Sequence, residues 1–383
     1  MFRLALLLLL CTPITGVAGA IVPAPPSINA AAYLLMDFQS GDILVEHNID
    51  ETLEPASLTK LMTAYVLAEE IDAGRLSLDD KVTVSRNAWS QNPLFKGSSL
   101  MWIEPGKPVT VAELEKGIVI SSGNDATVAI AEHIAGTEAA FADMMNRYAQ
   151  ELGMAGTHFT NSHGLPDPDH VTTARDLAVL AAATIRHHPD RYEVYSQQSY
   201  TYNDIKQYNR NLLLRDDPSV DGLKTGYTSS AGYGLVASAE RDGMRLISVV
   251  MGSASTRSRT SETRSLLNYG FRFYQTIEPV IADAVLGQAR VWQGQRDVLD
   301  AGVLSSVVMT VPRSNAEPEL KVVFDEPLVA PIQRGDPVGS LAVTLDGDVV
   351  YEQPLQALVD VPEAGFFARL WDALVLWLKT LFS

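Results

Sequence analysis

The sequence predicts an α/β protein of the α+β type, in which an antiparallel sheet is covered by helices and a helical lobe is inserted. Strand-like segments open and close the region 28–276, whereas its middle has helical periodicity. From residue 277 to 360 short apolar segments alternate with Gly and Pro, which predicts a small all-β domain. The last segment, 363–383, has the spacing of an amphipathic helix.

Length and charge bound the class of protein further. A chain of 383 residues predicts two or three domains, and 46% hydrophobic residues suffice for a full core. The net charge of −17 argues against nucleic acid as a partner and against a broadly basic membrane binder. Cationic side chains that gather at one place in so acidic a protein therefore indicate an anionic ligand.

The N-terminus predicts a secretory signal peptide over residues 1–20. Arg3 and the apolar run 4–10 precede small residues at 18–20, the pattern of a cleavage site. The apolar run is too short for a transmembrane anchor. Cys11 could suggest a lipoprotein, but the residue before it is too large for the usual lipobox. Because Cys11 is the single cysteine, the mature chain must be stable without disulfides.

The first domain begins with two strands, expected at 32–37 and 43–47, and a helix expected over 55–67. On that helix Ser57 and Lys60 lie three residues apart on one face, so the hydroxyl and the amine can meet. A serine is a poor nucleophile without a base, and a lysine is a poor base unless burial or a nearby cation lowers its pKa. The competing interpretation is that Ser57 is a plain helix cap.

The middle of the domain is expected to be helical. Residues 76–110 carry Gly, Pro and Asn and predict a surface excursion. From 111 to 153 the periodicity is helical and broken once, at 121–125, which is either a corner or a site. A dense turn region, 161–170, precedes a helix expected over 173–187.

The domain closes with strands and a helix. A short strand is expected at 200–202, followed by the segment 220–227. Two strongly apolar strands are expected at 234–239 and 244–251. A helix expected over 258–275 supplies an apolar face for the sheet.

The C-terminal β domain carries no nucleophile or histidine cluster, so spacing or docking is its expected role. The strands expected in the domain lie at 307–311, 320–324, 340–345 and 349–351. In the tail one narrow helical arc contains Arg369, Asp372, Ala373, Leu376, Lys379 and Thr380. The remaining arc is apolar and rich in Trp and Phe, which predicts a helix lying in a membrane interface. The alternative is a final helix packed on its own β domain.

Three short segments of the first domain carry a family resemblance: Ser57-x-x-Lys60, Ser122-Gly123-Asn124 and Lys224-Thr225-Gly226. In order and spacing they resemble the motifs of the penicillin-recognising serine enzymes. The segments 122–126 and 162–176 are similar to the low-molecular-mass penicillin-binding proteins that act as D-alanyl-D-alanine carboxypeptidases. The resemblance extends over the signal sequence, both domains and the tail, and implies the penicillin-recognising serine transferase fold.

The resemblance implies a task for each motif residue. Ser57 attacks the carbonyl of the penultimate D-Ala of a peptidoglycan pentapeptide, and Lys60 accepts its proton. Ser122 relays that proton to the leaving amine, and Asn124 orients Lys60 and the substrate amide. β-Lactams are expected to acylate Ser57 in the same way.

Binding of the peptide terminus is expected from the third motif. Lys224, Thr225 and the neighbouring Gly226 suit the terminal carboxylate, and Arg259 matches the family's later arginine. The oxyanion hole is expected from the backbone N–H groups of Ser57 and Tyr227. Cations near Lys60, Lys224 above all, would favour its neutral form. The family also implies a periplasmic enzyme attached to the outer face of the inner membrane.

Other functions remain as alternatives. A β-lactamase needs a base that activates water, yet no glutamate lies between Glu151 and Glu193, so Asp167, Asp169 or Asp176 would have to serve. An endopeptidase that cuts cross-links would use the same chemistry, although the β domain and the tail favour the carboxypeptidase. A non-catalytic scaffold that binds peptidoglycan is a third alternative.

The sequence predicts no cofactor and no metal site. His158, His163 and His170 lie in the turn region, without the helix-borne His-Glu-x-x-His of a metal peptidase. A serine mechanism therefore remains the interpretation that uses the motifs.

Overall fold

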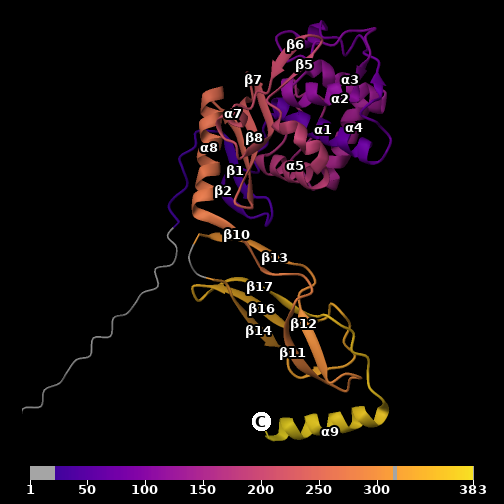
Figure 1. The fold of residues 1–383 in the computed structure, drawn as a ribbon, viewed down its shortest axis with the longest axis vertical. Helices are drawn as coiled ribbons and strands as arrows, with labels where there is room; N and C mark the ends of the chain where they lie inside the picture. Colours follow the sequence, from indigo (N-terminus) through magenta and orange to yellow (C-terminus); the bar gives the residue numbers. More distant parts are fainter. Residues whose placement is uncertain (1–21, 314–316, 383) are drawn as a thin grey trace, which may run out of the picture. The chain divides into compact units, whose positions relative to one another are not determined.

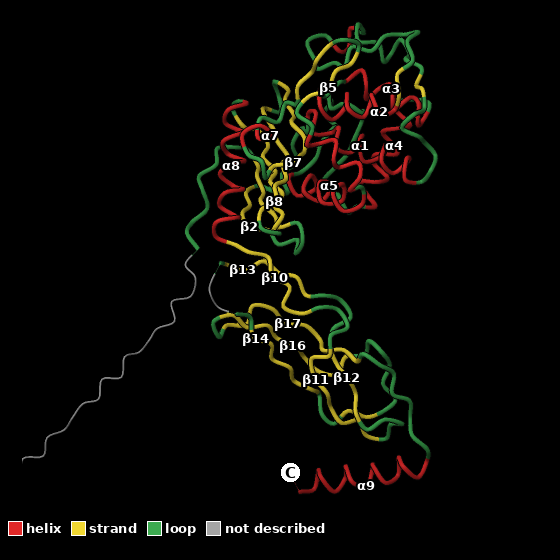
Figure 2. The backbone as a smooth tube through the Cα atoms, in the orientation of Figure 1, coloured by secondary structure: helices red, strands yellow, loops and turns green. Residues whose placement is uncertain are grey.

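The computed structural model describes residues 22–313 and 317–382 and divides into two compact units (Figures 1 and 2). One unit contains residues 24–276 with 309–311, and the other contains residues 277–308 and the chain from residue 312 onward. The expected signal peptide, 1–20, lies outside the described residues.

The first unit is built on a five-stranded antiparallel sheet in the order β2-β1-β9-β8-β7. The strands are β1 (Ala32–Asp37), β2 (Ile43–His47), β7 (Val220–Thr228), β8 (Gly232–Arg241) and β9 (Met244–Ser253). Successive residues in the middle of β8 and β9 are buried, so both faces of the sheet are covered. Figure 1 shows α8 (Thr256–Phe273) on one side of the sheet and α5 (Ala174–His187) on the other. The expected opening hairpin, closing strands and final helix are confirmed.

The helical lobe stands between β2 and β7 in the sequence, as expected. It is formed around α1 (Lys60–Asp72), α2 (Val111–Lys116), α3 (Asn124–Ala135) and α4 (Glu138–Glu151). Ten of the thirteen residues of α1 are buried, so this helix runs through the core rather than over it. Shorter elements join the lobe to the sheet: β3 (Lys81–Val82), β4 (Val109–Thr110), α6 (Pro189–Tyr192), β5 (Ser199–Tyr202), β6 (Ile205–Tyr208) and α7 (Leu213–Asp216).

The helical stretch from 111 to 153 is broken twice, not once. The second break follows α3, where Gly136 has a φ of +79° and Thr137 accepts a hydrogen bond from the Ala140 N–H at the start of α4. A glycine stop followed by a threonine cap is an ordinary helix boundary signal. The expectation of one continuous helix beyond 125 was therefore wrong.

The segment 76–110 is only partly a surface excursion. Phe95, Met101 and Ile103 are fully buried in the main core, although Gly, Pro and Asn surround them in the sequence. The strand pair β3–β4 closes the segment at its base. The prediction of a surface excursion was therefore wrong for Phe95, Met101 and Ile103, whereas residues 96–97 and Trp102 are exposed as expected.

The second unit is rich in strands, as expected. Its six-stranded sheet has the order β14-β16-β17-β12-β11-β15, and β10 and β13, which form a separate strand pair, lie only in part within this unit. The strands are β10 (Tyr274–Val280), β11 (Val285–Trp292), β12 (Val298–Gly302), β13 (Val307–Pro312), β14 (Glu319–Phe324), β15 (Leu328–Val329), β16 (Pro337–Leu345) and β17 (Asp348–Ala357). The fold class predicted for the chain is confirmed.

The terminal helix, α9 (Phe366–Phe382), contacts its own β domain through its polar arc. The Asp372 carboxylate accepts a hydrogen bond of 2.6 Å from the Gln293 N–H, and the Lys379 ammonium lies 5.1 Å from the centre of the Trp292 ring. The apolar arc is exposed at Phe366, Phe367, Leu370, Trp371, Leu374, Trp377 and Leu378. Contact with the β domain thus leaves the apolar arc uncovered by it.

Within the part of the chain that the structure describes, no helix combines the length and the hydropathy needed to cross a bilayer.

Candidate active site

The turn before α1 sets the position of Ser57. Ser57 lies in a short 3₁₀ turn, Ala56–Thr59, and not in the first turn of the α-helix, which begins at Lys60. Ala56 has a φ of +47°, a left-handed conformation that costs a non-glycine residue about 1–2 kcal/mol. Such strain persists where the surroundings enforce the conformation, and it is common at functional sites.

The Lys60 amine has three polar neighbours. Its Nζ lies 3.0 Å from the Ser57 Oγ, 2.7 Å from the Asn124 Oδ1 and 2.6 Å from the carbonyl oxygen of His163. The amide and carbonyl oxygens can only accept hydrogen bonds, whereas the serine hydroxyl can donate one. A neutral amine has two protons and one lone pair. With its protons on Asn124 and His163, Lys60 directs its lone pair to the Ser57 hydroxyl.

The charge state of Lys60 fits this arrangement. Burial of the amine lowers the pKa of Lys60 to about 7, from an ordinary 10.5. Asp125 and Glu138 raise the pKa against this effect, whereas Arg210 lowers it further. The prediction that Lys224 is the principal cation acting on Lys60 is not supported: burial is the main cause of the lowered pKa, and the positive charge that lowers it further is that of Arg210.

The second motif connects two buried groups. Ser122 has a left-handed conformation, with a φ of +63°, at the end of a π-helical turn, Gly117–Ser121. Its Oγ accepts a hydrogen bond of 2.9 Å from the Lys224 Nζ, while Asn124, the first residue of α3, contacts Lys60. Ser122 and Asn124 thus connect the lysine of β7 with the lysine of α1.

The third motif, on β7, lies against the turn that contains Ser57. A Cβ atom at Gly226 would lie 3.0 Å from the carbonyl oxygen of Pro55, so only glycine lets the strand approach the turn this closely. On another side, a Cβ atom at Gly164 would lie 1.8 Å from the carbonyl oxygen of Ala56. The backbone around Ser57 is therefore enclosed by two other backbone segments.

Lys224 is buried, and its burial lowers its pKa well below the ordinary value. The positive charges of Lys60, Arg210 and Arg259 lower this pKa further. An anion bound among these groups would reverse the effect, because it would stabilise their charged forms. The cluster of cations is thus poised for an anionic ligand.

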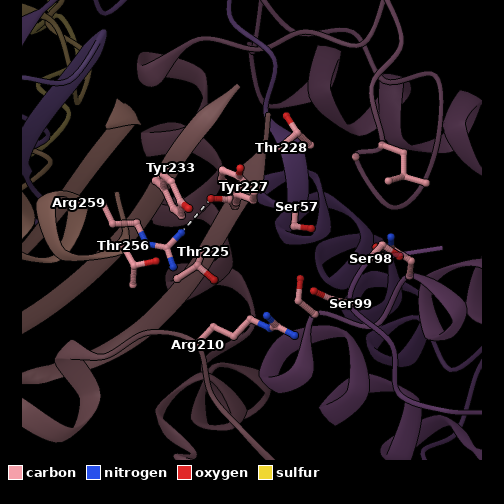
Figure 3. Close-up of a pocket in the computed structure, with 16 residues that line it drawn as sticks. Ser57, Ser98, Ser99, Arg210, Thr225, Tyr227, Thr228, Tyr233, Thr256 and Arg259 are labelled. Atoms are coloured by element: carbon pink, nitrogen blue, oxygen red, sulfur yellow. Dashed lines mark hydrogen bonds between the residues drawn. The ribbon is translucent and has the colours of Figure 1, made fainter. Parts of the chain in front are cut away.

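A cavity of about 250 Å³ opens over these motifs (Figure 3). It is lined by Ser57, Gly97, Ser98, Ser99, Ser122, Asn124, Gly164, Leu165, Arg210, Thr225, Gly226, Tyr227, Thr228, Tyr233, Thr256 and Arg259. None of these lining residues is a carboxylate, although the whole chain has 46 acidic residues. Ser57 and Tyr227, expected to supply the oxyanion hole, both line the cavity. The cavity is suited to an acidic chain end.

Arg259 reaches the cavity from the first turn of α8. Its Nη1 donates hydrogen bonds to the carbonyl oxygens of Gly226, at 2.9 Å, and Gly234, at 3.2 Å. These bonds fix the guanidinium beside the end of β7. Burial lowers the pKa of Arg259 to about 10, which leaves it charged at neutral pH.

Sequence reasoning missed two parts of the cavity. Arg210, which donates from Nε to the carbonyl oxygen of Ser121 at 3.2 Å, lies in no motif, and no local signal marked it. The second is the wall that contains Ser98 and Ser99, which the sequence predicts to be part of a surface excursion. No local signal marks that wall either: it is held by the buried carboxylate of Asp125, which accepts hydrogen bonds from the N–H groups of Met101, Trp102 and Ile103.

The residues proposed for rival mechanisms lie elsewhere. None of Asp167, Asp169 and Asp176 lines the cavity described above. Asp176 accepts hydrogen bonds from the Gly156 N–H and the Thr157 hydroxyl.

The histidines of the turn region are also engaged. The rings of His163 and His170 take part in hydrogen bonds with Leu165, Thr59 and Thr160. Among the residues that the structure describes, no group of three or more His, Cys, Asp or Glu side chains could hold a metal ion.

Comparison with known proteins shows the family of the chain. The family model for D-alanyl-D-alanine carboxypeptidases matches residues 20–255, and the model for the C-terminal domain of penicillin-binding protein 5 matches residues 274–363. The D-alanyl-D-alanine carboxypeptidase DacC of Escherichia coli strain K12 is 43% identical to this chain, and the match covers 98% of this chain and 96% of DacC.

Two solved structures extend the comparison. Penicillin-binding protein 5 from Haemophilus influenzae has a TM-score of 0.84 and 41% identity, over 89% of this chain and 100% of that chain. Penicillin-binding protein D2 from Listeria monocytogenes, in its cefotaxime-bound form, has a TM-score of 0.60 and 32% identity, over 65% of this chain and 100% of that chain. The fold, the three motifs and these matches agree: the chain belongs to the D-alanyl-D-alanine carboxypeptidase family.

Proposed function

We propose that this protein is a serine-type D-alanyl-D-alanine carboxypeptidase, which removes the terminal D-Ala from peptidoglycan pentapeptide stems through an acyl-enzyme on Ser57. The observation that carries the proposal is the Lys60 amine, 3.0 Å from the Ser57 Oγ, with its two other partners able only to accept hydrogen bonds. The family of the chain supplies the substrate class.

In the acylation step the Ser57 Oγ attacks the carbonyl carbon of the penultimate D-Ala. Lys60 takes the hydroxyl proton, since burial brings its pKa to about 7. The N–H groups of Ser57 and Tyr227 stabilise the oxyanion. When the C–N bond breaks, Ser122 passes a proton to the leaving D-Ala amine. Water then hydrolyses the ester and regenerates the Ser57 hydroxyl.

Binding of the substrate depends on its charged end. Lys224, Thr225 and Arg259 hold the terminal carboxylate, and Gly226 gives the strand its close approach to the reacting carbonyl. Asn124 orients both Lys60 and the substrate amide. Because the cavity lining carries no carboxylate of its own, a peptide with a free C-terminus is favoured over an amidated one.

β-Lactams are proposed to acylate Ser57 in the same way. The Listeria monocytogenes relative is described in a cefotaxime-bound form, and it shares 32% identity with this chain. A cyclic amide that is opened by Ser57 keeps its leaving amine attached, so the acyl-enzyme is expected to last longer than the one formed with a peptide.

We further propose that the chain is exported to the periplasm and lies on the outer face of the inner membrane through α9. The sequence of residues 1–20 has the pattern of a signal peptide, and the exposed arc of α9 is apolar, with Trp371 66% exposed and Phe367 83% exposed. These features support a helix that lies in the interface.

The test is mass spectrometry of the full chain after exposure to labelled penicillin, combined with an assay for D-Ala release from a pentapeptide. The expected result is one adduct, on Ser57, and release of one D-Ala per peptide. Undiminished labelling of a Ser57→Ala variant would indicate a non-catalytic scaffold instead. Rapid loss of the adduct with intact turnover of penicillin would indicate a β-lactamase, and cleavage of cross-linked dimers would indicate an endopeptidase.

A further inference from the structure

Of the three hydrogen-bond partners of the Lys60 amine, the carbonyl oxygen of His163 is the nearest, at 2.6 Å, and it belongs to a loop. The adjacent carbonyl, of Ser162, accepts a hydrogen bond of 2.6 Å from the Thr63 hydroxyl on α1. Two successive carbonyl groups of this loop therefore face the helix that carries the base. Asn161 of the same loop accepts hydrogen bonds from the N–H groups of His163 and Gly164, and the loop also has a partner outside α1.

One carboxylate holds both residues of this loop. The Glu138 Oε1 accepts a hydrogen bond from the Ser162 N–H at 3.0 Å and another from the Ser162 hydroxyl at 2.6 Å. The Nε2 of His163 lies 3.4 Å from the same oxygen. Because the Nδ1 of His163 accepts from the Leu165 N–H, the proton of the neutral ring is on Nε2, the nitrogen nearest to Glu138. The carboxylate thus receives two hydrogen bonds from Ser162 and has the ring of His163 beside it.

Glu138 itself is well placed to serve as an anchor. It is the first residue of α4, directly after the capping Thr137, where the helix dipole favours a negative charge. Its side chain also borders a second cavity, of about 310 Å³, which is lined by Asn87, Asn92, Leu94, Val128, Glu132, Gly136, Thr137 and Glu138. Neither Ser57 nor Lys60 lines that cavity.

We propose that Glu138 is a positioning residue for the general base: it fixes the peptide segment of Ser162 and His163, and so keeps the His163 carbonyl on the Lys60 amine with the lone pair turned to Ser57. The inference rests on the proposed serine mechanism and adds to it a residue that none of the three motifs contains. Glu138 acts through the loop, since no direct bond joins it to Lys60 among the described contacts.

The carboxylate has a second effect, through its charge. Glu138 raises the pKa of Lys60, as Asp125 does, and Arg210 lowers it. The other charged or titratable groups that interact with Lys60 are Lys224, His163 and His170. Both histidines are neutral at physiological pH, because burial lowers the pKa of His163 to about 3 and that of His170 to about 4. Glu138 is therefore one of two negative charges that set the pH range of the base.

Two substitutions separate position from charge. Glu138→Ala removes the acceptor, and Glu138→Gln keeps an oxygen for the Ser162 donors but removes the charge. The readout is the first-order rate constant of acylation at saturating penicillin, measured from pH 5.5 to 9 on the full chain. This constant does not depend on the fraction of the sample that is folded. Glu132→Gln, in the same second cavity but bonded to Asn87, is the matched control.

For Glu138→Ala we expect the rate constant at pH 8 to fall about tenfold or more, while half-saturation by penicillin changes little. For Glu138→Gln we expect most of the rate at pH 8 to remain, with the acid limb of the profile shifted by about half a pH unit to lower pH. The sign follows because removal of a negative charge destabilises the protonated amine. Glu132→Gln should behave as the parent chain does.

An unshifted acid limb in Glu138→Gln, together with an unchanged rate constant in Glu138→Ala, would overturn the proposal. If Glu138→Ala does not fold, the pH profile of the acylation rate constant of Glu138→Gln still tests the role of Glu138. Absence of a Ser57 adduct in the parent chain would instead overturn the proposed function, so the two failures are distinguishable.

Discussion

The two units of the molecule differ in which side chains lie in an unfavourable environment. The first unit buries many polar and charged side chains, Lys60, Lys224 and Arg259 among them, whereas Thr344 is the single polar side chain buried to that degree among the described residues of the second unit. The second unit instead exposes large apolar side chains along α9. Burial of a charge and exposure of an apolar face both cost free energy. In the first unit the buried charges lie at the proposed active site. In the second unit the exposed apolar side chains form the proposed membrane-binding face of α9.

Removal of the buried base should have the largest effect. Lys60→Met keeps most of the side-chain volume but removes the amine, so we expect acylation of Ser57 by penicillin to fall at least about 10³-fold. Lys321→Met, on the exposed strand β14 of the second unit, should change nothing. Labelled penicillin followed with time measures both. If Lys60→Met retained a tenth of the acylation rate, the buried amine of Lys60 would not be the general base.

A smaller effect is expected at the rim of the same cluster. Arg259→Ala removes a charged hydrogen-bond donor proposed for the substrate carboxylate. We therefore expect the KM for the pentapeptide to rise about 10- to 100-fold. Arg257→Ala, on the exposed side of the same helical turn, is the control. A pentapeptide with an amidated C-terminus should be indifferent to Arg259→Ala. Equal losses with the free and the amidated peptide would point to a structural role alone.

The pH dependence should follow from the same burial. Lys60 is active as a neutral amine, and its pKa is about 7, so acylation should rise with pH through 7 and then level off. We expect the rate at pH 6 to be about tenfold below that at pH 8. A stopped-flow profile with penicillin measures this. A level profile between these values would mean that Lys60 is not the group that titrates.

The smallest effect on catalysis is expected from the second unit. The double substitution Trp371→Glu and Leu374→Glu places two charges on the apolar arc of α9, and we expect at least about tenfold less protein to sediment with phospholipid vesicles. Ala373→Glu, on the polar arc, is the control. D-Ala release by all three proteins should be equal. A fall in D-Ala release without vesicles would show that α9 serves the first unit in some other way.

Much of the fold and of the candidate site could be predicted from the sequence. The apolar segments 32–37 and 43–47, joined by a polar turn with Gly41, predicted β1 and β2, and the three motifs indicated residues that converge on one cavity. Apolar side chains at regular spacing carry information that is local, and motif residues carry information about chemistry. Both kinds of information are present in the order of the amino acids itself.

The parts of the site that the sequence did not indicate depend on contacts between segments that are distant in the chain. Ser98 and Ser99 line the cavity because Asp125, more than twenty residues later, binds the N–H groups beside them. Arg210 reaches the site only through the folding of β5 and β6, and the partner from His163 is a backbone carbonyl that any residue could supply. Sequence patterns at one position do not encode such contacts. Even the turn of Ser57 differed: residues Ala56–Thr59 form a 3₁₀ turn, and the expected α-helix begins only at Lys60.

The two glycines that enclose the Ser57 turn have a further consequence. Any side chain at Gly164 would overlap the carbonyl of Ala56, and one at Gly226 would press on that of Pro55. Bacteria under selection by an antibiotic that acylates this serine could not narrow its entrance at these positions without displacing the nucleophile as well. We expect resistant variants of such an enzyme to change at the outer, solvent-facing edge of the cavity, where a bulkier residue leaves the reacting atoms in place.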